Sequence, residues 1–286
     1  MKKIGVIVNT KRSCTEAVLS ELKQLAYQYG FTLYAENIEI AETIGATFLP
    51  IGDFAKKVEL ALAMGGDGTV LYAARALHGS SVPIMGINLG SLGFLTSVGD
   101  SEIAPALDAL ANGYLKNSVR DVIDCRIFAN GKTLGAKPAL NDVVLGWGAS
   151  SRIVTLKLSI DGEPVGSFMC DGMMVSTPTG STGHSLSAGG PILHPGICGI
   201  GINVICPHTL GSRPLVVPNT SLIEIEVTNA AKELILSIDG QDEYKIEQSG
   251  RIKIRRSPHQ IRFLQLPSHS YFSVLAQKLH WRGSAL

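Results

Sequence analysis

A glycine-rich turn that carries a single carboxylate is the clearest chemical feature of the sequence. Gly65, Gly66, Asp67, Gly68 and Thr69 follow a short apolar run and precede a pattern of helical spacing. Glycine lets backbone amides approach an anion closely, and the N-terminus of the next helix adds a partial positive charge. Because a carboxylate repels phosphate, its presence here favours a role as proton acceptor for an attacking hydroxyl or as a metal ligand. A plain helix cap is the structural alternative.

A second chemical feature is the hydroxyl-rich stretch 176–187, which is mostly Ser, Thr and Gly and holds no Asp, Glu, Lys or Arg. Hydroxyls and backbone amides suit the recognition of ribose and phosphate. Such clusters are also typical of solvated loops. A flexible linker is disfavoured because Pro178 stiffens the stretch and apolar Val175 and Leu186 anchor its ends.

Two shorter patterns add polar groups. Asn141 and Asp142 precede an apolar run at 143–145 and offer an amide and a carboxylate to a ribose or an adenine. The sequence Asp-Gly-Gln at 239–241 is a second pattern of this kind. Taken alone, each favours a turn rather than a binding site.

Several function classes lack their motifs in this chain. The sequence has no G-x-x-x-x-G-K-[ST] loop, no G-x-G-x-x-G fingerprint and no G-x-S-x-G elbow. Its seven histidines show no metal-ligand spacing, so no protein-held metal site is predicted, and only His184 lies in the hydroxyl-rich stretch. Lys plus Arg (25) nearly balance Asp plus Glu (24), which disfavours a nucleic-acid partner.

The setting of the protein is also indicated by composition. Five cysteines without a C-x-x-C pair argue against a disulfide framework and suit a reducing compartment. No run approaches the roughly 18 apolar residues of a membrane span. The apolar run at 4–8 is too short for a signal peptide and is better interpreted as a first strand. We therefore expect a soluble, cytoplasmic protein that does not bind membranes.

The pattern of expected secondary structure divides the chain into two parts. Residues 1–117 alternate strand and helix patterns, which predicts an α/β domain with a parallel sheet. Its expected strands are 4–8, 31–33, 60–64 and 82–87, and its clearest helix is 15–29. Another glycine-rich turn, 88–93, follows the fourth strand.

Residues 118–267 are expected to form an all-β domain. Asn-Gly at 130–131 and Asp-Gly at 161–162 are hairpin signals. The expected strands include 153–160, 221–227, 234–238 and 252–255. The tail 268–286 carries Phe272, Leu275 and Leu279 at helical spacing, and we expect it to return to the first domain.

Taken together, the motifs resemble those of the NAD kinase family nearly end to end. The order of the matches is more specific than the Gly-Gly-Asp-Gly-Thr turn, because lipid kinases and phosphofructokinases carry related turns. The matching segments are 65–69, 88–96, 141–142, 171–191, 210–218, 239–241 and 271–281.

The resemblance implies a kinase that uses ATP and Mg²⁺ to phosphorylate the 2′-hydroxyl of the adenosine ribose of NAD. It implies NAD bound between the two domains and a homodimer or homotetramer. Asp67 corresponds to the catalytic base, and Gly65, Gly66, Gly68 and Thr69 to the phosphate-binding turn. The positions implied to bind NAD are Gly68, Asn141, Asp142, Asp171, Thr179, Thr182, Gly183, His184, Ser187 and Gln241.

Two positions depart from the family pattern. Asp142 replaces the usual Glu and is one methylene shorter, and His184 replaces the usual Tyr and can gain charge near neutral pH. Two other functions are open to the same turn: a lipid kinase, which needs an apolar pocket or membrane-facing patch, and a non-catalytic nucleotide-binding regulator. The polar stretch 181–187 disfavours the first, and the carboxylate of Asp67 disfavours the second.

Overall fold

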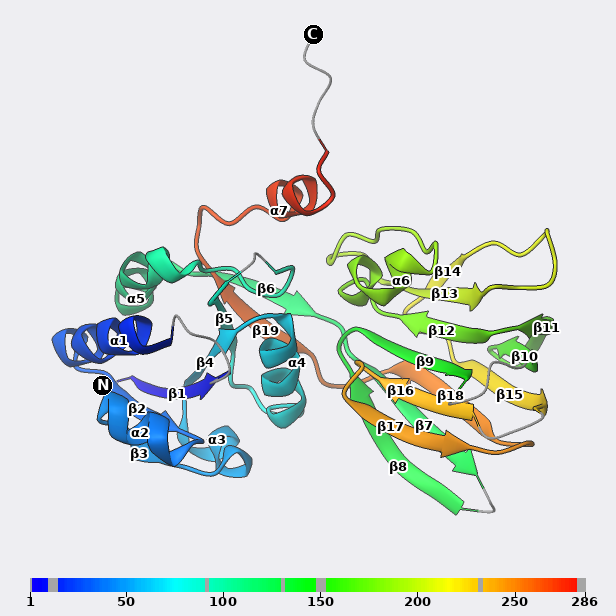
Figure 1. Ribbon diagram of the computed structural model, residues 1–286, viewed down its shortest axis with the longest axis horizontal. Coiled ribbons are helices and arrows are strands. Elements are labelled where there is room, and N and C mark those ends of the chain that lie inside the picture. Colours follow the sequence, from blue (N-terminus) through cyan, green and yellow to red (C-terminus); the bar gives the residue numbers. More distant parts are fainter. Residues whose placement is uncertain are drawn as a thin grey trace, which may run out of the picture. The chain divides into compact units, whose positions relative to one another are not determined.

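The computed structural model describes residues 2–9, 15–90, 93–129, 132–147, 153–230 and 234–281. The chain divides into two compact units (Figure 1). The first comprises residues 1–119 with 261–286, and the second comprises residues 120–260.

The first unit is built on a seven-stranded sheet in the order β3-β2-β1-β4-β5-β19-β6. All the pairings of β1 to β5 are parallel, as the alternating sequence pattern predicts. The four expected strands form within two residues of their predicted starts. The strands are β1 (Lys3–Val8), β2 (Thr32–Ala35), β3 (Thr47–Phe48), β4 (Leu60–Gly65), β5 (Ile84–Asn88), β6 (Lys116–Arg120) and β19 (Ile261–Gln265).

Helices cover both faces of this sheet. The buried side chains of α1, α2 and α5 share one core cluster with alternate residues of β1, β4 and β5. On the other face, Gly5 makes room for the Phe54 ring of α3, and Gly86 makes room for Val70 of α4, because a Cβ would lie 2.5 Å and 3.0 Å from them. The helices are α1 (Thr15–Tyr29), α2 (Ile38–Ile44), α3 (Ile51–Lys57), α4 (Asp67–Ala76) and α5 (Ile103–Asn112), preceded by the 3₁₀ turn η1 (Asp100–Glu102).

The strand order creates a switch point between β1 and β4. From β1 the chain builds outward through β2 and β3, and it then crosses to the opposite side of β1 to form β4 and β5. Ligands of such sheets bind beyond the carboxyl ends of the strands at this point. The Gly-Gly-Asp-Gly-Thr turn follows β4 and lies there.

The second unit contains two antiparallel six-stranded sheets, in the orders β11-β10-β15-β18-β7-β8 and β14-β13-β12-β9-β16-β17. Side chains from both sheets form one apolar core, as in a β-sandwich. The strands are β7 (Ile123–Ala129), β8 (Lys132–Ala139), β9 (Asp142–Trp147), β10 (Val154–Ile160), β11 (Glu163–Cys170), β12 (Gly172–Ser176), β13 (Gly199–Ile205), β14 (Leu215–Pro218), β15 (Ile223–Asn229), β16 (Leu234–Ile238), β17 (Asp242–Ile246) and β18 (Arg251–Arg256). This confirms the predicted all-β texture.

The two hairpin signals have different outcomes. Asp161 and Gly162 join β10 to β11 with φ of 53° and 85°, and this pair of left-handed residues is typical of a tight two-residue turn. The signal at 130–131 lies outside the described residues.

The C-terminal segment, residues 261–286, belongs to the first unit. Phe263 of β19 pairs with Ile84 of β5, and α7 (Tyr271–Lys278) follows. The predicted apolar face of α7 is wrong at one position. Phe272 is 65% exposed, whereas Val274 and Leu275 are the buried residues. No helix in the described part of the chain is long and apolar enough to span a membrane.

Asp121 connects the two ends of the second unit. Its carboxylate accepts hydrogen bonds from Asn219 Nδ2 at 2.6 Å, Gln260 Nε2 at 2.7 Å and Arg256 Nε at 3.1 Å. The carboxylate therefore ties the first residues of the unit to its last ones.

We expect Asp121→Ala to lower the free energy of unfolding by about 1.5–3 kcal/mol, the usual worth of hydrogen bonds to a charged group. Urea unfolding of the purified protein measures this loss. Glu224→Gln is the matched control, because it breaks the partly exposed ion pair of Glu224 with Lys253, which should be worth about 1 kcal/mol or less. Equal losses in the two variants would show that Asp121 has no special role.

Candidate functional site

The Gly-Gly-Asp-Gly-Thr turn connects β4 directly to α4. β4 ends at Gly65, and α4 begins at Asp67 after Gly66. A Cβ on Gly65 would lie 2.3 Å from Thr69 Oγ1, so glycine is required for the Thr69 side chain to fold back against the turn. The first turn of α4, with its amides, is thereby presented at the carboxyl edge of the sheet.

Asp67 is held by another loop rather than by its own helix. Its Oδ2 accepts a hydrogen bond from the Phe94 amide at 2.9 Å, and its Oδ1 accepts one from the Leu95 amide at 3.0 Å. No side chain caps α4. The alternative interpretation of Asp67 as a plain helix cap is therefore wrong.

The second glycine-rich turn is the partner of Asp67. A Cβ on Gly93 would lie 2.0 Å from Asp67 Oδ1, so only glycine allows the carboxylate to approach this loop. The Gly93 amide donates to Oγ1 of Thr96, which is buried. The sequence places this turn after a strand without indicating what it contacts. Residues 91–92 of the turn lie outside the described residues.

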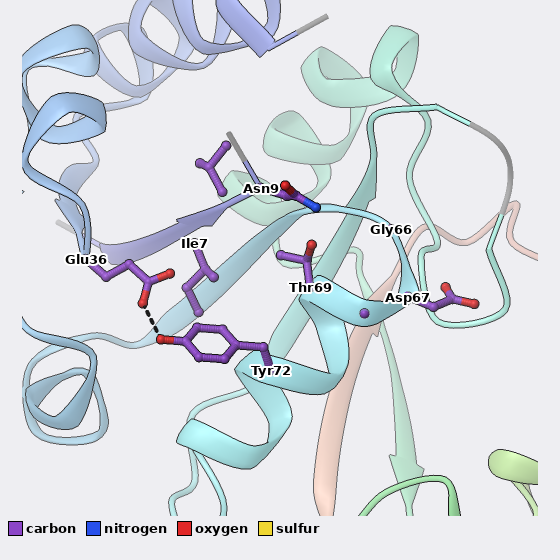
Figure 2. Close-up of a pocket in the computed structure, with 9 residues that line it drawn as sticks. Ile7, Asn9, Glu36, Gly66, Asp67, Thr69 and Tyr72 are labelled. Carbon is purple, nitrogen blue, oxygen red and sulfur yellow. Dashed lines mark hydrogen bonds between the residues drawn. The ribbon is translucent and has the colours of Figure 1, made fainter. Parts of the chain in front are cut away.

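A cavity of about 450 Å³ lies beside the turn. Val8 and Asn9 line it from the end of β1, Glu36 from the end of β2, and Gly66 to Thr69 and Tyr72 from α4 and the residue before it. Figure 2 shows Glu36 and Tyr72 joined by a hydrogen bond on one side of the turn, with the Asp67 carboxylate pointing away on the other side.

In the second unit, Asp239 fixes the backbone of Asn141 and Asp142. Asp239 Oδ1 accepts from the Asn141 amide at 2.7 Å and the Asp142 amide at 3.1 Å, and Oδ2 accepts from the Leu140 amide at 2.9 Å. Asp239 itself has a φ of 52° in the turn between β16 and β17. The Asp-Gly-Gln pattern is thus a hairpin turn, as predicted, and it also positions the candidate binding pair.

Asp239 is a functional candidate that the sequence analysis missed, since only Gln241 of this motif was assigned to NAD. Its role depends on contacts almost a hundred residues apart in the chain. The only available signal was an aspartate within a motif that also matched the family.

The hydroxyl-rich stretch is a folded turn rather than a solvated loop, so that alternative is wrong. Thr177 Oγ1 donates to the Leu140 carbonyl at 2.5 Å and accepts from the Gly180 amide at 3.1 Å. Ser181 Oγ donates to the Pro178 carbonyl and accepts from the Leu193 amide. The stretch forms the 3₁₀ turn η2 (Gly180–Thr182) and the short helix α6 (His184–Ser187).

The turn packs directly on Asn141. A Cβ on Gly180 would lie 2.1 Å from the Asn141 carbonyl oxygen, and one on Gly183 would lie 3.9 Å from Asn141 Nδ2. Asn141 Oδ1 is buried, and no described residue donates a hydrogen bond to it. A buried acceptor without a donor is costly unless a ligand or water supplies one.

The candidate NAD-binding residues do not all gather at this place. Thr179 and Thr182 are buried in the turn, whereas Gly183, His184 and Ser187 are exposed beside it. Asp171 precedes β12, and Ser176 at the far end of β12 pairs with Asp142. Asp171 therefore lies roughly 17 Å from Asp142 at the usual rise per residue. Asp171 instead contacts the Cys206 thiol and raises its pKa.

Comparison with known proteins follows the same two-part division. Residues 4–115 match the ATP-NAD kinase N-terminal domain, and residues 140–266 match the ATP-NAD kinase C-terminal domain. The chain belongs to the ATP-NAD kinase family. An NAD kinase of Geotalea daltonii is 37% identical over 282 residues, which cover 98% of this chain and 99% of that protein. An NAD kinase of Azoarcus sp. is 38% identical over 257 residues, 89% of this chain and 87% of that one.

Solved structures of the family share the fold. Yeast NADH kinase in complex with NADH matches with a TM-score of 0.91 at 24% identity, covering all of this chain and 89% of that one. An NAD kinase from Archaeoglobus fulgidus in complex with ATP matches with a TM-score of 0.79 at 23% identity, covering 98% and 100%. These likenesses agree with the predicted α/β and all-β architecture.

The side chain of Asp142 is buried at the start of β9, next to another acid. Burial, and secondly the negative charge of Asp239, raise the pKa of Asp142 from 3.8 to about 7. A substantial share of Asp142 is therefore protonated at neutral pH and can donate a hydrogen bond as well as accept one. Both abilities suit the recognition of a sugar hydroxyl.

This pKa makes the folding stability depend on pH. Between about pH 4 and 7 the folded protein retains a proton on Asp142 that the unfolded chain releases, so stability falls as pH rises through this window. Asp142→Asn should remove that fall. Urea unfolding of both proteins across pH 4.5–8 measures this effect. The free energy of unfolding of the variant should rise relative to that of the wild type up to about pH 7, and the difference should then stay constant. Parallel curves would contradict the raised pKa.

Proposed function

We propose that the protein is an NAD kinase that transfers the γ-phosphate of ATP to the 2′-hydroxyl of the adenosine ribose of NAD. One observation carries the proposal: the carboxylate of Asp67, within the glycine-rich turn at the start of α4, is fixed by two backbone amides. Membership in the ATP-NAD kinase family supplies the identity of the substrates.

Asp67 is the proposed catalytic base. An ionised carboxylate has about four acceptor sites, and the amides of Phe94 and Leu95 occupy two of them. The remaining sites can accept the hydrogen of an attacking hydroxyl while the side chain stays oriented. Phosphoryl transfer has a loose transition state, so the proton leaves late, and alignment of the two substrates matters more than base strength.

The donor phosphates are assigned to Gly65, Gly66, Gly68 and Thr69. The first-turn amides of α4 and its positive N-terminal end suit an anion at this position. The relative from Archaeoglobus fulgidus was solved with ATP, which supports the same donor here.

Mg²⁺ is proposed to enter with ATP. Within the described residues no group of three or more His, Cys, Asp and Glu side chains could hold a metal. Mg²⁺ usually keeps several waters and binds in large part through substrate phosphates, so the ATP phosphates can hold the ion without a dedicated protein site. When bound, the ion would neutralise phosphate charge.

NAD is assigned to the turn around Asn141. The buried Oδ1 of Asn141, which accepts no hydrogen bond from the described residues, could accept one from an adenine amine. Asp142, which can be protonated near neutral pH, suits a ribose hydroxyl. Thr179, Thr182, Gly183, His184, Ser187 and Gln241 are proposed to complete this surface. Gly68 is assigned to NAD through the family resemblance alone. Asp171 belongs to the same proposal through the family resemblance alone.

Incubation of the purified protein with ATP, Mg²⁺ and NAD tests the proposal, with NADP detected through a coupled dehydrogenase. We expect NADP to accumulate. Phosphorylation of diacylglycerol or sphingosine instead would indicate a lipid kinase. Binding of both nucleotides without any product would indicate a non-catalytic regulator.

Self-association into a homodimer or homotetramer is also proposed. Two edge strands of the second unit, β11 and β14, carry exposed apolar side chains at Val165, Met169, Leu215 and Val216. Exposed apolar edge strands favour pairing with another chain, and a second copy is the partner that the family resemblance implies. Sedimentation of the purified protein should give two or four subunits, and a monomer at micromolar concentration would contradict this.

The proposed compartment is the cytoplasm. The described cysteines are all free thiols, which suits a reducing environment. Burial raises the pKa of Cys125 to about 12 and that of Cys170 to about 11, so neither reacts readily as a thiolate.

Asp67→Asn should lower kcat by about 10²–10⁴-fold, the usual worth of a positioned proton acceptor. The affinity for NAD, measured by calorimetry, should change only a few-fold. The amide also places an N–H group opposite Phe94 or Leu95, so part of the loss reflects orientation.

Gly93→Ala separates orientation from chemistry, because the new Cβ displaces the carboxylate without removing it. We expect a lower kcat here as well. Asp53→Asn, on the exposed start of α3, is the control and should retain full activity. Near-normal turnover in Asp67→Asn would exclude Asp67 as the base.

A further inference from the structure

The cavity beside the turn contains a polar pair that the proposed reaction does not use. Glu36 follows β2, and Tyr72 lies one turn into α4. Figure 2 shows both side chains on the side of the turn opposite the Asp67 carboxylate. The acceptor chemistry assigned to Asp67 therefore leaves this part of the cavity free for the other substrate.

The position of Glu36 in the sheet is that of a ribose-binding acid. The cavity lies beyond the carboxyl ends of β1, β2 and β4, at the switch point of the strand order. In doubly wound nucleotide-binding sheets an acidic residue at the end of the second strand hydrogen-bonds ribose hydroxyls. Here the phosphate turn follows β4, two strands from β2, which is roughly 10 Å at the usual strand spacing.

The local geometry of Glu36 keeps one oxygen available. Tyr72 Oη donates a hydrogen bond to Glu36 Oε2 at 2.9 Å, and no described residue donates to Oε1. Burial raises the pKa of Glu36, while the bond from Tyr72 lowers it. A half-buried carboxylate is costly to maintain, and its free oxygen at a cavity wall suggests a ligand with hydroxyl donors.

We propose that Glu36, held in place by Tyr72, accepts hydrogen bonds from the ribose hydroxyls of the phosphate donor. The donor selected by this site is then a nucleoside triphosphate rather than inorganic polyphosphate. The inference rests on the proposed kinase function and adds the basis of donor selection. Glu36 is a specificity-determining residue, and Tyr72 is its positioning residue.

The negative charge of Glu36 also disfavours inorganic polyphosphate as the donor. Inorganic tripolyphosphate has no ribose hydroxyl to donate, and its unesterified end carries an additional negative charge where ATP carries its neutral ribose. Like charges in a partly buried site repel. A nucleoside triphosphate instead places its uncharged sugar against Glu36 and its phosphates against the glycine-rich turn.

Equilibrium binding measured by calorimetry without NAD tests the proposal. The ligands are ATP, 2′,3′-dideoxy-ATP and inorganic tripolyphosphate. The wild-type protein should bind ATP about 10- to 100-fold more tightly than dideoxy-ATP, the range expected for hydrogen bonds to a charged group. Glu36→Ala should bind the two nucleotides within about threefold of each other, because no acceptor remains.

Two further variants separate charge from hydrogen bonding and position. Glu36→Gln removes the charge, so tripolyphosphate should bind more tightly than it does to the wild type. Tyr72→Phe leaves the carboxylate unanchored, so the preference for ATP should shrink but persist. Glu39→Ala, an exposed acid in the first turn of α2, is the matched control and should bind all three ligands as the wild type does.

The proposal is overturned if the wild type binds ATP and dideoxy-ATP equally, if it binds no ATP, or if Glu36→Ala keeps the full preference. These binding results do not depend on phosphate transfer. A protein that shows the expected preference but forms no NADP would contradict the proposed function and leave the role of Glu36 intact.

Discussion

The paired hydrogen bonds between the Asp67 carboxylate and the amides of Phe94 and Leu95 are the constraint on which this account depends. They join the turn after β4 to the turn after β5, two loops that β4 and β5 bring to one sheet edge. The close approach requires glycine at position 93. A carboxylate that would repel phosphate is thereby bonded to the neighbouring loop, as its proposed role as a base requires.

The same arrangement separates the two tasks of the first unit. Amides at the start of α4 suit the donor phosphates, and Asp67 faces the other side of the turn. In the second unit Asp239 has a comparable role, since its three amide bonds fix the backbone that carries Asn141 and Asp142. In both units, hydrogen bonds from main-chain amides to an aspartate carboxylate determine the geometry of a loop.

Local patterns predicted much of the fold, because a strand such as 234–238 or a helix such as 15–29 is determined by its own apolar periodicity. They did not predict β19, a five-residue strand that forms by pairing with the distant strand β5. They placed Phe272 on the same helical face as Leu275, but in the fold the side chain of Phe272 is exposed and that of Leu275 is buried. The contacts of Glu36, Asp67 and Asp239 join positions 27 to 99 residues apart. Residue type therefore indicated the chemistry of Asp67 but not its partners, and it indicated no role for Glu36 or Asp239.

Phosphorus-31 NMR of the product formed from ATP and NAD tests the central claim most directly. A carboxylate fixed by two amides should orient only one substrate hydroxyl for attack on the donor phosphate. We therefore expect a single new phosphate ester, at the 2′-position of the adenosine ribose. Phosphate distributed over several ribose hydroxyls, or ATP hydrolysed without transfer to NAD, would contradict it.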